Sequence, residues 1–198
     1  MMRHLLCIAL LIAARPGVAG DVTVKYRLMG LFQPDRAEDL RKQAGTLAID
    51  EGGAKTLVKL VDIDFEAATA TFSYDADAKA FQGKSPQQVH ESINNHLRNA
   101  SRHNFNAFPP DTSKPEKLVR ERIAVAGLDC KGCAYGAYRA VATIDGVDRA
   151  VVSFKGGHVT AWIDPSKTKR EALVAALKKA EVDVVEPETA RGKSADAR

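Results

Sequence analysis

The 198-residue sequence predicts an α+β fold in which two units of the order βαββαβ follow one another after a signal peptide. Three observations support this prediction. An apolar run at the N-terminus lies between a basic start and a stretch of small residues. A series of strand-like and helix-like segments then occurs twice. A segment rich in proline and charge separates the two occurrences.

The first 20 residues have the pattern of a secretory signal peptide. A basic start precedes the apolar run from Leu5 to Ala14, and the small residues 17–20 follow it. About ten apolar residues are too few to span a bilayer, which needs ~20. We therefore expect residues 1–20 to be cleaved, Cys7 to be lost with them, and the protein to be exported to a periplasm or secreted. No membrane span is expected after cleavage.

The charge balance excludes some classes of function. Loss of Arg3 and Arg15 with the signal peptide leaves 27 of the 29 basic residues against 25 acidic ones, a net charge of +2. Basic and acidic residues are interleaved along the chain, whereas a nucleic-acid-binding protein is expected to have a basic stripe with stacking aromatic residues. No catalytic triad, phosphate-binding glycine loop or carboxylate pair is legible, so we expect neither nucleic-acid binding nor enzyme activity.

Residues 21–108 are expected to form the first unit. Its predicted elements are a strand at 22–29, a helix at 35–44, a hairpin of strands at 57–65 and 69–74, a helix that starts at Ser85 and Pro86, and a strand at 104–108. An extra loop, 45–55, is expected before the hairpin. The segment 109–117, PPDTSKPEK, has no apolar periodicity and is predicted to be a linker.

Residues 118–186 are expected to form the second unit. Its predicted elements are a strand at 120–125, a helix at 134–144, a hairpin of strands at 147–154 and 158–163, a helix that Thr168 and Glu171 begin as a capping box, and a strand at 182–185. In the aligned hairpin turns, Ala67 and Ala68 correspond to Gly156 and Gly157. The order βαββαβ in about 70 residues is the ferredoxin-like split βαβ arrangement, so we predict two ferredoxin-like sandwiches in tandem. The polar tail, 187–198, is expected to be disordered.

Cys130 and Cys133 are the most informative pair of residues. They lie in GLDCKGC, residues 127–133, between a predicted strand and a predicted helix. Two intervening residues close too small a loop to stabilise a fold, so the pair is expected to have a chemical role. Backbone N–H groups and the helix dipole favour the thiolate, which both binds metal ions and attacks disulfides. The spacing alone therefore leaves metal binding and thiol–disulfide exchange open.

The first unit lacks this pair. Its loop reads GLFQPDR, residues 30–36, with Gln33 and Arg36 in the positions of Cys130 and Cys133. Neither an amide nor a guanidinium group replaces a thiolate as a ligand for soft metals. The first unit is expected to have the fold without the metal site, and to orient or dock a partner.

The second unit resembles the heavy-metal-associated (HMA) domains of copper chaperones, of the periplasmic mercuric-ion carrier and of the N-terminal domains of metal-pumping ATPases. The resemblance rests on GLDCKGC as a form of the family motif G-M-x-C-x-x-C, on Gly146–Val147 at the start of the hairpin, and on the last helix and strand. It implies that Cys130 and Cys133 bind one copper(I), zinc(II) or mercury(II) ion and exchange it with a donor or acceptor protein. The first unit is then a degenerate HMA-like copy.

Three positions depart from the family pattern. Leu128 replaces the usual methionine, and Glu181–Val182 replaces the glycine and the Tyr, Phe or Lys that often follow it, which weakens the assignment to copper. Asp129 resembles the variant of zinc, cadmium and lead pumps and is a candidate third ligand, although aspartate is also common at helix starts. Two alternatives stay open: a thiol–disulfide redox protein, and a protein-interaction module without a metal role.

Overall fold

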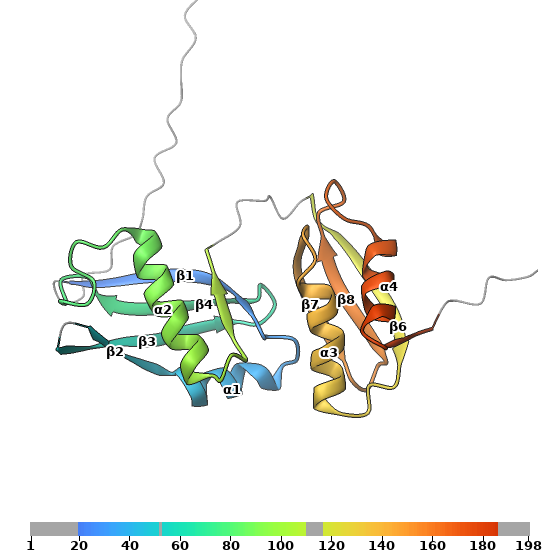
Figure 1. Cartoon of the computed structure of the whole chain (residues 1–198), viewed down its shortest axis with the longest axis horizontal. Coiled ribbons are helices and arrows are strands. Elements are labelled where there is room, and N and C mark those ends of the chain that lie inside the picture. Colours follow the sequence, from blue (N-terminus) through green and yellow to red (C-terminus); the bar gives the residue numbers. More distant parts are fainter. Residues whose placement is uncertain (1–19, 52, 110–116, 186–198) are drawn as a thin grey trace, which may run out of the picture.

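The computed structural model describes residues 20–51, 53–109 and 117–185 (Figure 1). The expected signal peptide apart from Gly20, the linker from 110 to 116 and the expected tail lie outside the described residues. Within the described part, no helix is long and apolar enough to cross a membrane. We refer to residues 20–109 as the first unit and to residues 117–185 as the second unit.

The first unit is an antiparallel sheet with two helices. Its elements are β1 (Asp21–Met29), α1 (Asp35–Ala44), β2 (Thr46–Glu51), β3 (Ala54–Asp64), β4 (Thr69–Asp75), α2 (Pro86–Ala100) and β5 (Asn106–Phe108). The strand order in the sheet is β2-β3-β4-β1-β5. Without β2, this is the order of a ferredoxin-like sheet, in which the first strand lies between the third and the fourth.

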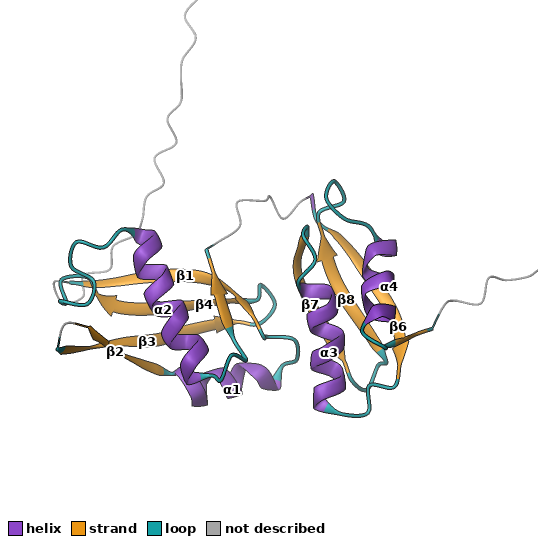
Figure 2. Cartoon of the chain, in the orientation of Figure 1, coloured by secondary structure: helices purple, strands orange, loops and turns teal. Residues whose placement is uncertain are grey.

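The second unit has the same arrangement without the additional strand. Its elements are β6 (Val119–Ala126), α3 (Lys131–Ala142), β7 (Val147–Ser153), β8 (His158–Ile163), α4 (Arg170–Lys179) and β9 (Asp183–Val184), and the strand order is β7-β8-β6-β9. Helices α3 and α4 lie on the same side of this sheet (Figure 2). The predicted α+β fold with two ferredoxin-like units is confirmed.

One predicted loop of the first unit is a strand. Residues Thr46–Glu51 form β2, which pairs with β3 from Thr46 opposite Lys59 to Glu51 opposite Ala54. Leu47 and Ile49 are buried, while Ala48 and Asp50, each following one of them, are exposed. This alternation is typical of a strand at the edge of a core. The prediction of an extra loop at 45–55 was wrong because the insertion extends the sheet by one hairpin.

The starts predicted for α2 and α4 had different outcomes. Ser85 caps α2 as predicted, with Gln88 completing a capping box and Pro86 in the first turn. The predicted box of Thr168 and Glu171 is wrong, because α4 begins at Arg170. The backbone N–H of Thr168 instead donates to the carbonyl of Asp164, 3.0 Å away, so Thr168 belongs to the preceding turn.

The hairpin turns show that the two units are related as the sequence alignment predicted. Ala68 has a φ of 50° and Gly157 a φ of 54°, a region that glycine adopts more readily than alanine. The Leu28 N–H donates to the Ala68 carbonyl at 2.7 Å, and the Val125 N–H donates to the Gly157 carbonyl at 2.9 Å. The first strand of each unit therefore contacts its hairpin turn through an equivalent hydrogen bond.

Each unit has its own hydrophobic core. The first is formed around Leu40, Ile49, Phe72, Ile93 and Phe105. The second is formed around Ile123, Val141, Val159, Ile163, Leu173 and Leu177. One residue of the first unit, Phe32, is 4% exposed and belongs to the core of the second unit.

Candidate metal centre

The two cysteines lie at the surface, where β6 leads into α3. Gly127 follows β6 with a φ of +71°, which lets the chain turn, and Leu128 is buried in the second core. The loop is thereby attached to the domain on one side, while Asp129, Cys130 and Cys133 are all exposed. The backbone therefore presents both sulfur atoms to solvent.

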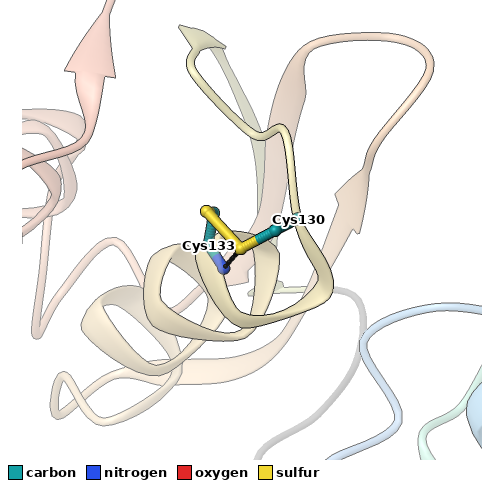
Figure 3. The surroundings of a disulfide bond; sticks show 2 residues. All are labelled: Cys130 and Cys133. Carbon is teal, nitrogen blue, oxygen red and sulfur yellow. Dashed lines mark hydrogen bonds between the residues drawn. A yellow bond between two sulfur atoms is a disulfide. The ribbon is translucent and has the colours of Figure 1, made fainter.

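The start of helix α3 brings the two sulfurs together. Cys130 is the N-cap residue, and its Sγ accepts a hydrogen bond from the Cys133 backbone N–H at 3.0 Å. The Cα atoms of the two residues are 5.1 Å apart, and the sulfurs are joined in a disulfide bond (Figure 3). Helix α3 starts at Lys131, three residues earlier than predicted, because the loop between Gly127 and the helix is very short.

The chemistry of this pair depends on its redox state. A disulfide has no thiolate to donate to a metal ion. Reduction by two electrons and two protons gives two thiols, and loss of their protons gives two soft ligands. Backbone N–H groups of the first helical turn favour the thiolates, as the hydrogen bond to Cys130 Sγ illustrates. The reduced pair can bind one soft ion, and the oxidised pair can act as a two-electron acceptor.

A third ligand is not assembled in the structure. Among the described residues, no group of three or more His, Cys, Asp or Glu side chains is placed to hold a metal ion. Asp129 is exposed directly before Cys130. Its part as a third ligand stays a prediction.

The corresponding loop of the first unit is packed against the rest of that unit through Arg36. Gly30 has a φ of +106° and is the counterpart of Gly127. The loop after Gly30 is one residue longer than the loop after Gly127, so Pro34 rather than Gln33 is the N-cap of α1. Arg36 pairs with Asp39 at 2.6 Å, and its guanidinium carbon lies 4.7 Å from the ring centroid of Phe105. This loop is packed and offers no soft ligand.

The degenerate loop contacts the cysteine helix through Phe32. Counted from the glycines, Phe32 corresponds to Asp129. Its ring stacks on Tyr138 with the centroids 5.1 Å apart and packs at 5.6 Å against Tyr135. The Phe32 carbonyl accepts a hydrogen bond of 2.9 Å from the Val152 N–H, on the free edge of β7. The sequence interpretation missed Phe32, although a large aromatic residue in a surface loop was a signal for it.

Further polar contacts join the two units. The Gly30 N–H donates to the Tyr138 hydroxyl at 2.8 Å in a buried position. Arg27 donates to the Asp148 carbonyl at 2.8 Å at one end of the contact. At the other end, Lys131 and Asp35 form an exposed ion pair of 3.2 Å. Such an exposed pair contributes little stability, so the aromatic packing and the buried hydrogen bond are the main contacts.

Tyr138 makes this contact sensitive to high pH. Burial raises the pKa of its hydroxyl to about 12, although the hydrogen bond from Gly30 acts in the opposite direction. Because the unfolded chain loses this proton near pH 10, the neutral hydroxyl stabilises the folded protein below pH 10, and this contribution is lost as the pH rises to about 12.

We expect the free energy of unfolding to fall by roughly 2–3 kcal/mol between pH 10 and 12 on account of Tyr138. Denaturant titrations over this range measure it. Tyr138→Phe should reduce the fall, while Tyr26, whose pKa burial also raises to about 12, still contributes. Tyr135→Phe is the matched control on the same helix, because it leaves the Tyr138 hydroxyl in place. An equal pH dependence in wild type and Tyr138→Phe would contradict the prediction.

Comparison with known proteins identifies the second unit. Residues 122–183 match the family model of the heavy-metal-associated domain. The CopZ metallochaperone is 31% identical, and the match covers 34% of this chain and 100% of that chain with a TM-score of 0.33. No curated protein matches the chain.

Two ATPase domains are also similar. A copper binding domain from HMA7, a P-type ATPase, is 21% identical over 35% of this chain and 96% of that chain, with a TM-score of 0.32. The N-terminal domain of the zinc(II) ATPase ziaa in its apo form is 23% identical over 35% of this chain and 99% of that chain, with a TM-score of 0.32. Through its second unit, with the cysteine loop between β6 and α3, the chain belongs to the heavy-metal-associated domain family.

Proposed function

We propose that the chain binds one soft or borderline metal ion through reduced Cys130 and Cys133 and exchanges it with a partner protein. The observation that carries this proposal is the pair of exposed cysteines at the start of α3, with Cα atoms 5.1 Å apart. Thiolates prefer copper(I), zinc(II) and related ions. The similarity to a metallochaperone supports metal exchange rather than permanent binding.

Copper(I) and zinc(II) are the ions that we propose first, with mercury(II) as a further candidate. Two thiolates are enough for copper(I) or mercury(II), whereas zinc(II) usually has four ligands. Asp129 would add a harder oxygen ligand and so favour a divalent ion. We further propose that the protein acts outside the cytoplasm, because of the N-terminal leader pattern, and that it is not an enzyme.

Metal titration tests the proposal directly. The chain without residues 1–20 is titrated with copper(I), zinc(II) and mercury(II) against competing chelators, once reduced and once oxidised. We expect a one-to-one complex with the reduced protein and none with the oxidised protein. Equal binding by both forms would place the site elsewhere and refute the proposal. Asp129→Ala should weaken zinc(II) binding more than copper(I) binding, and an equal loss would contradict the proposal that Asp129 favours a divalent ion.

A thiol–disulfide redox function is the second candidate, and the disulfide between Cys130 and Cys133 favours it. In this function the exposed disulfide would accept two electrons from a partner dithiol through a mixed disulfide. Turnover in a disulfide-reduction assay, combined with weak metal binding by the reduced protein, would favour this function over metal exchange.

A further inference from the structure

The outer face of the second sheet gathers arginine side chains around one tryptophan. Pairing of the strands places Arg120, Trp162 and Arg149 side by side across β6, β8 and β7. Side chains alternate between the two faces of a strand, so Arg122 and His158 lie on the same face as this row. Ile123, Val159 and Ala161, which alternate with these residues, belong to the buried core of the second unit. This core lies on the side of the sheet that α3 and α4 cover (Figure 2). We call Arg120, Arg122, Arg149, His158 and Trp162 the arginine face.

The side chains of the arginine face contact one another. The guanidinium carbon of Arg149 lies 3.8 Å from the ring centroid of Trp162, and that of Arg120 lies 5.6 Å away. Arg122 Nη2 lies 3.1 Å from His158 Nδ1. A guanidinium group that stacks on a ring keeps its N–H donors in its own plane, where they can bind an acceptor. The ring contacts therefore limit the motion of two arginines without using their donors.

No carboxylate among the described residues forms an ion pair with the three arginines. The acidic neighbours along the strands have other partners. Glu121 accepts a hydrogen bond from Arg170 at 3.1 Å, and Asp148 lies beside Arg27. The nearly neutral chain thus has three positive charges on one sheet face. This cluster is not evident from the sequence, in which basic and acidic residues are interleaved. Only strand pairing brings together arginines from separate segments.

We propose that the arginine face binds an extended acidic segment of a partner protein. Arg120 and Arg122 are two residues apart on β6, and alternate side chains of an extended peptide have the same repeat of about 7 Å. Carboxylates at alternate positions of such a segment can therefore meet both guanidinium groups, each of which can bind a carboxylate through two hydrogen bonds. Arg149 already stacks on the Trp162 ring, which disfavours the base stacking that single-stranded nucleic acids need.

The arginine face is placed where a bound partner protein would leave the cysteines accessible. Arg120 lies near the start of β6, and the cysteine loop follows the end of the same strand. Among the described residues, the hydrogen bonds and the ion pair from the first unit reach α3 and the edge strand β7 rather than β6 and β8. A partner held on the arginine face would leave Cys130 and Cys133 exposed. This binding does not require a metal ion, so it can be tested separately from the proposed function.

Trp162 allows a direct measurement, because it is the only tryptophan of the chain. A hexaglutamate peptide is titrated into the chain without residues 1–20 at low salt, and the Trp162 fluorescence is recorded. We expect a saturable change. The double variant Arg120→Glu, Arg149→Glu should bind at least about tenfold more weakly, because like charges then face each other. If circular dichroism shows that this variant is unfolded, Arg120→Gln with Arg149→Gln replaces it and should also weaken binding.

Lys169→Glu with Lys179→Glu is the matched control. It changes the net charge by the same amount at exposed positions at the two ends of α4, and its affinity should stay within about twofold of wild type. If the control lost the same affinity for the peptide, the effect would be due to net charge alone, and the proposal would be overturned. Absence of a saturable change would overturn it as well. Tighter binding of oligothymidylate or of anionic lipid vesicles would assign the face to nucleic acid or membrane instead.

Discussion

Replacing Cys133 by serine is expected to lower the affinity of the reduced protein for copper(I) by about a hundredfold or more. Zinc sites with four ligands have apparent binding free energies of ~10–16 kcal/mol, so one ligand contributes about 3 kcal/mol, or a factor of about 100. A serine hydroxyl is harder than a thiolate and keeps its proton at neutral pH, so it does not replace the lost ligand. Chelator competition under reductant measures the change.

Cys130→Ser should show the same loss without unfolding the domain. Cys130 is the N-cap of α3, and serine is a favourable residue at this position. Loss of metal binding can therefore be separated from loss of structure by a thermal melt. Lys131→Ala is the matched control, because it changes the same exposed loop and leaves both sulfurs in place. Binding that persisted in both serine variants would show that the cysteines are not the ligands.

Phe32→Ala is expected to separate the two units. Removing a buried phenylalanine typically costs ~3–5 kcal/mol, and here the lost packing is with Tyr135 and Tyr138 of the other unit. The Gly30 and Val152 N–H groups, whose hydrogen bonds accompany this packing, should then exchange with solvent much faster. We expect a single cooperative unfolding transition in wild type and two transitions in Phe32→Ala. Denaturant titration and amide hydrogen exchange measure the two effects.

Phe154→Ala is the control for the loss of a phenylalanine. Phe154 lies after β7 in the hairpin turn and is 43% exposed, so its removal should change the unfolding free energy by less than about 1 kcal/mol. If Phe32→Ala behaved like Phe154→Ala and left the Gly30 and Val152 amides protected, the two units would not be joined through Phe32. The expected role of the first unit in orienting or docking a partner would then lack its structural basis.

Local features of the fold could be predicted because their signals are local. Ser85, Pro86 and Gln88 lie within one turn of the start of α2, and the helix starts at Ser85 and Pro86 as predicted. The helix end at Ala44 and the hairpin of β7 and β8 likewise follow short patterns. Strand β2 was missed although Leu47 and Ile49 alternate with exposed residues, because the run is short and has no counterpart in the second unit. The Thr168 box failed because the Asp164 turn competed for the same residue.

The sequence by itself determined the two repeated units and the cysteine pair at the start of a helix, since strand and helix periodicity and the CxxC spacing involve neighbouring residues. Only the tertiary structure decided that Phe32 leaves its own unit, that Tyr138 binds Gly30, and that Arg120, Arg149 and Trp162 share one face. Gly30 and Tyr138 are 108 residues apart in the sequence. Contacts of this kind depend on how the sheets and helices pack, and no short pattern in a single sequence encodes that packing.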